Sequence, residues 1–268
     1  MPDTLLRVQN LKKVYETASG PVEAIGDISF EMRQGELVCI VGPSGCGKTT
    51  LLKCIAGLLK PTAGRIELAG RAVTSPPPSM ALVFQEYGRS LYPWLTVRGN
   101  VELPLRHKKL SAAERGQLID DALEAVGLEH SARNYPWQLS GGMQQRVAIA
   151  RAVAYHPEVL IMDEPFAAVD AQTRADLEDL VRALHLERGM SILFVTHDID
   201  ESVYLGERVV VLSTSPTWVQ DDVAIDLAPE RDQIITRALP RFTELRTHVY
   251  EQIQRAKRGE AVRPPAQA

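Results

Sequence analysis

Short runs of apolar, often β-branched residues recur along the chain. The runs at 37–41, 81–84, 159–162 and 192–195 are almost wholly apolar, which is typical of strands buried on both faces of a sheet. Residues 28–32 alternate apolar and polar instead, as a strand with one exposed face does. Segments with helical spacing separate most of these runs. The pattern predicts an α/β fold whose parallel sheet is covered by helices.

Sequence signals also mark the ends of several helices. Residues 111–114 (Ser-Ala-Ala-Glu) form a capping box, and Gly127 is a typical helix end. Ser140 is a typical N-cap for the next helix, which Pro157 stops. The segment 86–157 is therefore predicted to be a helical subdomain inserted between strands of the core.

Further elements follow along the chain, and the signals weaken from Ser213 onward. Asp170 is expected to cap a helix that Gly189 ends. Residues 218–227 are interpreted as a pair of strands, and residues 243–255 as an amphipathic helix. Residues 259–268 have the composition of a disordered tail. Further strands are predicted at 5–10, 65–69 and 208–212.

Three regions follow from this pattern. The core comprises residues 1–85 and 158–230, the inserted helical subdomain spans 86–157, and a helical extension with a disordered tail spans 231–268. The N-terminal part before residue 37 is mainly β. The predicted fold class is α/β, with an N-terminal antiparallel β part and the helical insertion.

Composition narrows the class of protein. The chain of 268 residues is 45% hydrophobic and 24% charged, as an ordinary globular protein is. A net charge of −4 without long blocks of one sign gives no reason to expect a nucleic-acid partner. No apolar run approaches the ~18–20 residues needed to span a bilayer. The N-terminus lacks the features of a signal peptide, so we expect the chain in the cytosol.

The strongest motif lies between the predicted strand at 37–41 and a predicted helix. Residues 42–49 fit G-x-x-x-x-G-K-[ST], the P-loop of nucleotide-binding proteins, in the strand–loop–helix context that supports it. Its glycines let backbone N–H groups turn toward a phosphate. Lys48 can reach the β- and γ-phosphates, and the Thr49 hydroxyl can bind Mg²⁺. The alternative, a glycine turn that binds nothing, does not explain the Lys-Thr ending.

Polar residues end three other buried strands. Gln85 follows one strand, Asp163 and Glu164 follow another, and His197 follows the third. Ligands of open parallel sheets lie beyond the carboxyl ends of the strands, so these residues are predicted to meet at the γ-phosphate. Asp163 suits an acidic contact to Mg²⁺ through water, and Glu164 a general base.

His197 can hydrogen-bond the γ-phosphate and the attacking water, and Gln85 can bind Mg²⁺ or place that water. Taken one at a time, these residues have ordinary structural explanations. Asp163 and Glu164 can be an acidic helix cap, and His197 a satisfied histidine at a strand end. Their occurrence together with the P-loop favours the catalytic interpretation.

A second glycine pair also opens a helix. Ser140, Gly141 and Gly142 offer a hydroxyl, free amides and a helix N-terminus, which together form a second anion site. If both anion sites act on one nucleotide, two chains must come together.

The sequence resembles the nucleotide-binding subunits of ATP-binding cassette (ABC) transporters from Leu5 to about Ser213. The motifs are specific as a set: the P-loop at 42–49, Gln85, the signature Leu139–Arg146, Asp163-Glu164-Pro165, Asp170 and His197. The resemblance implies a P-loop NTPase core, ATP and Mg²⁺ as cofactors, and ATP hydrolysis coupled to transport across a membrane.

The resemblance also implies roles for individual residues. Tyr15 stacks on adenine, the signature of one chain, including Gln144, faces the P-loop of the other, and Asp170 lies at the loop between the two sites. The catalytic set is Glu164, His197, Gln85 and Lys48, and the Mg²⁺ contacts are Thr49, Gln85 and Asp163. The ATP-binding set is Tyr15, Gly42, Pro43, Ser44, Gly45, Cys46, Gly47, Lys48, Thr49 and Thr50.

A narrower resemblance concerns residues 85–97 and 198–213, which are similar to bacterial importers of nitrate, sulfonate and taurine. It implies a second cassette, transmembrane permease subunits, an external substrate-binding protein and a peripheral place on the cytoplasmic face of the inner membrane. The aromatic stretch with Tyr87, Tyr92 and Trp94 falls where the family's cassette receives a permease helix, although surface packing explains it equally well.

Two other classes of function stay open at the level of sequence. One is an ABC ATPase that acts on nucleic acid or the ribosome, although such proteins commonly carry two cassettes or a long coiled coil. The other is a nucleotide switch without turnover, against which Glu164 and His197 argue.

Overall fold

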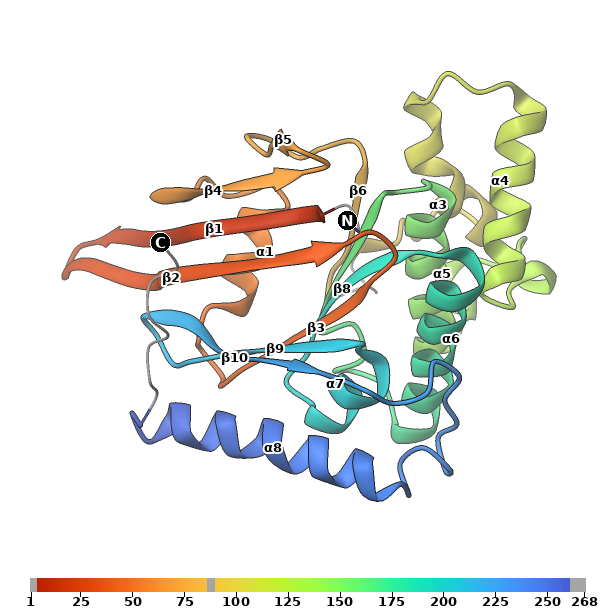
Figure 1. Ribbon diagram of the computed structural model, residues 1–268. Helices are drawn as coiled ribbons and strands as arrows, with labels where there is room; N and C mark the ends of the chain where they lie inside the picture. Colours follow the sequence, from red (N-terminus) through yellow and green to blue (C-terminus); the bar gives the residue numbers. More distant parts are fainter. Residues whose placement is uncertain (1–3, 86–89, 261–268) are drawn as a thin grey trace. The chain divides into compact units, whose positions relative to one another are not determined.

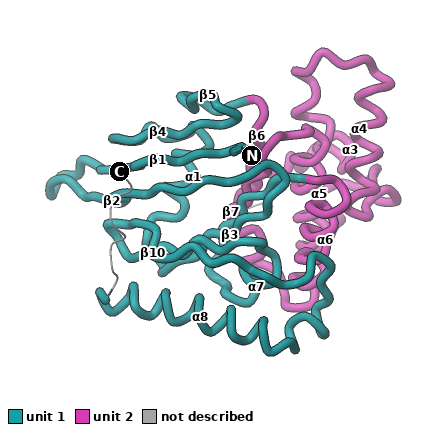
Figure 2. Tube along the Cα trace, viewed as in Figure 1, with its two compact units in different colours: residues 1–77, 190–268 teal, residues 78–189 magenta. Residues whose placement is uncertain are grey.

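The computed structural model describes residues 4–85 and 90–260, which form two compact units, coloured teal and magenta in Figure 2. Unit 1 draws on residues 1–77 and 190–268, and unit 2 on residues 78–189. Tyr87 and residues 261–268, to which the sequence analysis assigned an aromatic contact and a disordered tail, lie outside the described residues.

Unit 1 is built on a mixed β-sheet with the strand order β5-β4-β1-β2-β10-β9-β3-β8 (Figure 1). Its first half is antiparallel, because β1 pairs with both β2 and β4 in that sense. In its second half β3 runs parallel to β8 and to β9. The strands are β1 (Thr4–Thr17), β2 (Gly20–Arg33), β3 (Leu37–Val41), β4 (Ala63–Leu68), β5 (Arg71–Ala72), β8 (Ser191–Val195), β9 (Arg208–Leu212) and β10 (Thr217–Ala224).

The helices of unit 1 are α1 (Lys48–Ile55), α7 (Ile199–Leu205) and α8 (Pro240–Lys257). Helix α8 packs against α7, β9 and β10, along which it runs in Figure 1. Its apolar residues at helical spacing, among them Phe242, Leu245 and Val249, are buried there. All five residues of β3 are also buried, so the core of unit 1 lies around this strand.

Two predicted elements of unit 1 differ from the structure. The strand predicted at 5–10 continues to Thr17, because backbone pairing with β2 holds the polar residues that follow Asn10. The strand pair predicted at 218–227 is wrong. Residues 217–224 form the single strand β10, which pairs with β9 on one side and β2 on the other, so its polar residues are fixed by backbone hydrogen bonds.

In unit 2 two parallel strands, β6 and β7, pair with each other, and the chain between them forms several helices. The described residues of its segment 90–158 form helices, turns and irregular segments and contain no strand. Helix α5 is central, since it packs against α3, α4, α6 and β6. The elements are β6 (Met80–Val83), α3 (Val97–Glu102), η1 (Leu103–His107), α4 (Ala112–Ala125), η2 (Glu129–Ser131), η3 (Pro136–Gln138), α5 (Gly141–Ala154), β7 (Val159–Asp163) and α6 (Ala171–Arg188).

The caps predicted for these helices are confirmed. Ser111 and Glu114 form both hydrogen bonds of a capping box at α4. The side chains of Ser140 and Asp170 accept backbone N–H groups at the starts of α5 and α6. Gly189 ends α6 with φ at 61°, a left-handed conformation that favours glycine.

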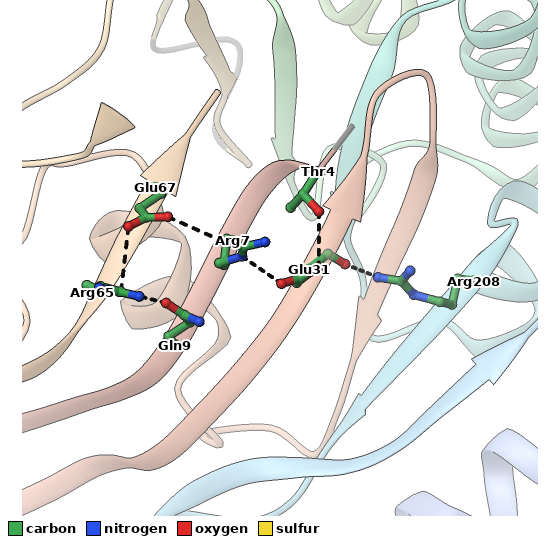
Figure 3. Close-up of polar contacts among 7 residues, drawn as sticks. All are labelled: Thr4, Arg7, Gln9, Glu31, Arg65, Glu67 and Arg208. Carbon is green, nitrogen blue, oxygen red and sulfur yellow. Dashed lines mark hydrogen bonds and ion pairs between the residues drawn. The ribbon is translucent and has the colours of Figure 1, made fainter. Parts of the chain in front are cut away.

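Polar side chains cross the sheet of unit 1 from strand to strand (Figure 3). Arg7 on β1 donates to Glu31 on β2 at 2.6 Å and lies 3.8 Å from Glu67 on β4. Arg208 on β9 donates to the main-chain carbonyl of Glu31 and, at 2.8 Å, to the carboxylate of Glu36. These contacts link the four strands β1, β2, β4 and β9.

Arg7 and Arg208 differ in how far they and their carboxylate partners are buried. The side chains of Arg208 and Glu36 are only 19% and 11% exposed, whereas those of Arg7 and Glu31 are 37% and 51% exposed. Arg208→Gln is expected to lower the free energy of unfolding by about 2 kcal/mol, because it leaves the largely buried carboxylate of Glu36 without its cationic partner. Arg7→Gln is expected to lower it by about 0.5 kcal/mol at most, since exposed pairs contribute little. Urea denaturation of both variants checks this, and equal losses would contradict it.

Candidate functional site

The P-loop joins β3 to α1 in unit 1. Gly45 and Gly47 have φ values of 76° and 96°, which L side chains rarely adopt, so the loop depends on glycine at both places. Gly47 is also the N-cap of α1 and offers no side chain to the helix. No side chain caps the helix, and a helix N-terminus favours an anion.

Lys48 is the first residue of α1, and its side chain is 7% exposed. Its Nζ donates to the carbonyl of Gly42 at 3.0 Å and to that of Pro43 at 3.3 Å. The ammonium thus lies across its own loop, beside the amides that favour phosphate. Thr49 is exposed in the first turn, which fits a hydroxyl offered to Mg²⁺. Cys46 is buried, so its side chain faces the protein.

A buried threonine on β10 supports this loop, and the sequence analysis did not single it out. The Oγ1 of Thr217 on β10 hydrogen-bonds the carbonyl of Cys46 and lies 3.1 Å from the carbonyl of Ala24. Thr217 is wholly buried. Its segment carries no motif, and Thr217 directly precedes the region 218–227 that was interpreted as a pair of strands.

Tyr15 lies beside the P-loop helix, as a ring that stacks on adenine would. Its hydroxyl is 3.2 Å from the hydroxyl of Thr50 on α1, and Lys13 Nζ is 5.2 Å from the centre of the ring. The side chain is 37% exposed, which leaves part of the ring open. The geometry is compatible with the predicted contact.

His197 follows β8, the strand parallel to β3. Val195 is the register partner of Ile40, and the N–H of Thr196 donates to the carbonyl of Ile40 at 3.1 Å. The two strands therefore end together, and the exposed His197 leaves the sheet at the same edge as the P-loop. Unit 1 thus unites Tyr15, the P-loop and His197.

Unit 2 holds the other predicted catalytic residues at the ends of its two strands. Val83 of β6 pairs with Met162 of β7, so Gln85 and the pair Asp163-Glu164 follow neighbouring strand ends. Asp163 is buried, with 8% exposure. Glu164 has a φ of 45°, which is rare for a residue with a side chain and is strained backbone of the kind found at functional sites.

The signature loop and Asp170 also belong to unit 2. Ser140 accepts the N–H of Met143 at 3.3 Å, as predicted for the cap of α5. The side-chain amide of Gln144 donates to the carbonyls of Pro136 and Leu139, and so holds the loop before the helix. The N–H and then the hydroxyl of Thr173 hold the pKa of Asp170 below its usual value, so this cap stays ionised.

Two aromatic pairs stand out on the surface of unit 2. Tyr92 and Trp94 meet edge to face with centroids 5.1 Å apart, and Tyr135 and Trp137 stack at 6.0 Å. Trp94 is 69% and Trp137 70% exposed. The sequence analysis singled out the first pair but missed the second, whose signal was an aromatic residue on each side of Pro136.

Asn100 fixes the loop that carries the first pair. It is wholly buried, and its side chain makes hydrogen bonds to the backbone of Tyr92, Leu95 and Thr96. The N–H of Val97 in turn donates to the carbonyl of Asn134 at 2.8 Å, which links this loop to the segment of the second pair. The aromatic side chains are therefore presented by a rigid surface.

The predicted site residues are thus divided between the units. Within the described ranges, no group of three or more His, Cys, Asp and Glu side chains is able to hold a metal ion by itself. None of the helices in the described part of the chain has the length and apolar character to cross a membrane.

This P-loop, set between a buried parallel strand and an uncapped helix, defines a P-loop nucleotide-binding protein of the α/β class. Comparison with known proteins identifies the family within this class. The family model described as ABC transporter matches residues 25–167. The chain belongs to the ABC transporter family, as one of its ATP-binding, ATP-hydrolysing subunits.

The relatives and a solved structure agree with this family. A nitrate import ATP-binding protein of Synechococcus elongatus is 41% identical over 91% of this chain and 89% of its own. A bicarbonate transport ATP-binding protein of Synechocystis is 38% identical over 92% of this chain and 88% of its own. The solved structure of a dimeric ATP-binding cassette with bound ADP and phosphate covers 84% of this chain and all of its own, with 33% identity and a TM-score of 0.72. The predicted fold class is confirmed.

Proposed function

We propose that this chain is the ATPase subunit of an importer for a small anion, of the kind that nitrate, bicarbonate, sulfonate and taurine represent. The observation that carries the proposal is a P-loop and a Ser140-capped signature helix in one chain with 41% identity to a nitrate import subunit. The chain works at the cytoplasmic face of the membrane, held there by permease subunits. An external binding protein delivers the anion to those subunits.

Two copies pair head to tail around two ATP molecules. The signature loop of one copy, with Ser140, Gly141 and Gly142, closes on the nucleotide that the P-loop of the other holds. Support comes from the presence of two anion-binding helix ends in one chain and from the dimeric state of a similar cassette. A second, similar cassette can take the place of the identical copy.

Each nucleotide is bound by the residues that the sequence motifs single out. Lys48 and the amides of residues 42–50 bind the phosphates, and Tyr15 stacks on the adenine. Thr49 and Gln85 contact Mg²⁺, and Asp163 does so through water. The metal supplies charge neutralisation on the phosphate oxygens.

Hydrolysis needs a base and a group that orients the water. Glu164 accepts the proton of the attacking water at its carboxylate, and His197 hydrogen-bonds the γ-phosphate. ATP favours the closed pair and hydrolysis releases it. Closing and reopening would then move the permease subunits.

The exposed aromatic pairs supply the contact with the permease. Trp94 and Trp137 are large, rigid and mostly exposed, which is the character of residues that anchor protein interfaces. Asn100 holds the loop of Trp94 in place before the partner arrives, so little conformational entropy is lost on binding.

One experiment separates this function from its rivals. The chain is expressed with an affinity tag in its own host and purified from detergent-solubilised membranes. Permease subunits are expected to co-purify, and Trp94→Ala is expected to release them while leaving ATP hydrolysis unchanged. Co-purification of ribosomal RNA or DNA instead of membrane subunits would overturn the proposal, as would the absence of ATP hydrolysis.

A further inference from the structure

Gly142 of helix α5 faces Thr173 of helix α6 within unit 2. Both residues lie in the first turn of their helices. A Cβ placed on Gly142 would stand only 2.3 Å from Cγ2 of Thr173. Carbon atoms in ordinary contact are about 3.5–4.0 Å apart. The methyl group of Thr173 therefore fills the space that any side chain at position 142 would need.

The other branch of the same side chain belongs to the cap of α6. Thr173 Oγ1 donates to Asp170 Oδ2 at 2.7 Å, and the N–H of Thr173 donates to Oδ1 at 3.0 Å. Rotation of the side chain would move the methyl group away from Gly142, but it would also break the hydroxyl bond to Asp170. Because a β-branched side chain has few rotamers, the two contacts hold or fail together.

We propose that Thr173 is a positioning residue that locks the signature loop to the Asp170 loop within each chain. The inference rests on the proposed head-to-tail pairing, in which the signature loop touches the partner's nucleotide and Asp170 lies between the two sites. Since the methyl group of this side chain lies against Gly142 and its hydroxyl holds Asp170, the signature loop cannot shift toward the Asp170 loop without disturbing that cap. Closure around one nucleotide then acts on the loop between the two sites.

A rescue experiment tests the lock, with Glu164→Gln as the parent so that bound ATP is retained. Gly142→Ala forces a methyl group into that of Thr173 and is expected to weaken ATP-dependent dimerisation about tenfold or more. Thr173→Ser removes only the methyl group and keeps the hydroxyl bond to Asp170. The double variant, which combines Gly142→Ala and Thr173→Ser in the Glu164→Gln parent, is expected to dimerise with an affinity within about threefold of the parent. Sedimentation velocity with ATP measures the dimer affinity.

The methyl group that Gly142→Ala adds could instead obstruct the partner's nucleotide. In that case Thr173→Ser does not restore ATP-dependent dimerisation, and the positioning role is overturned. Thr247→Ser, the same chemical change on the exposed face of α8, is the matched control and is expected to rescue nothing. A rescue by the control would also overturn the role.

Two measurements distinguish a loss of the Thr173 contact from a loss of folding and from a failure of the proposed pairing. ATP binding to the monomer, at protein concentrations below the dimer affinity, is expected to be the same in all variants, whereas a loss of folding would lower it. A parent that binds ATP without forming dimers overturns the proposed pairing itself. Dimers in the parent without rescue in the double variant overturn the role of Thr173 alone.

Discussion

Glu164→Gln is expected to lower ATP hydrolysis at least about a hundredfold while ATP-dependent dimers persist, because removal of a general base costs about 10²–10⁴ in rate. The amide keeps the size of the side chain but does not accept the proton of water. Nucleotide binding by the P-loop amides and Lys48 is left in place. Phosphate release measures the rate, and light scattering with ATP and Mg²⁺ measures the dimer.

Glu158→Gln is the matched control for that variant. Glu158 directly precedes β7, is exposed, and lies at the opposite end of the strand from Glu164. Its replacement is expected to leave the rate of hydrolysis within about twofold, as surface changes do. Loss of the dimer in Glu164→Gln, or an unchanged rate, would contradict the role given to this carboxylate.

Lys48→Met is expected to have the second large effect, and of a different kind. The methionine side chain keeps the apolar length but removes the ammonium that lies across the P-loop. Since hydrogen bonds to charged groups contribute about 1.5–3 kcal/mol, affinity for ATP is expected to fall about ten- to a hundredfold. Hydrolysis and dimerisation fall with it, whereas Glu164→Gln loses hydrolysis alone.

The control for this variant comes from the same helix. Lys53 lies in the last turn of α1 and is exposed, so Lys53→Met is expected to keep both binding and hydrolysis. Titration with a fluorescent ATP analogue measures the affinity of both variants. Equal affinity in Lys48→Met and the parent would contradict the assignment of Lys48 to the phosphates.

The sequence was most informative where the chemistry is local. A cap is set by residues three positions apart, and the caps of Ser111, Ser140 and Asp170 are present as predicted. Buried strands such as β3 were equally visible, because both faces of a covered parallel strand are apolar. The motifs at the strand ends predicted the class of protein before any fold was known.

Contacts between residues that are far apart in the sequence could not be predicted from local patterns. Thr217 reaches the P-loop from a strand that lies about 170 positions further along the chain. Strand β10 is polar and is fixed by its two neighbours, so periodicity alone did not show that it is a single strand. The roles of Asn100 and Trp137 likewise depend on two loops, around Tyr92 and around Asn134, that come into contact only in the folded unit.

The division of the chain also bears on how it is made. Unit 2 is a continuous stretch, whereas unit 1 is split between the two ends of the sequence. Strand β3 emerges early from the ribosome, yet its partners β8 and β9 are synthesised some 150 positions later. The apolar β3 therefore lacks its strand partners during translation, the stage at which unpaired apolar strands are prone to aggregate.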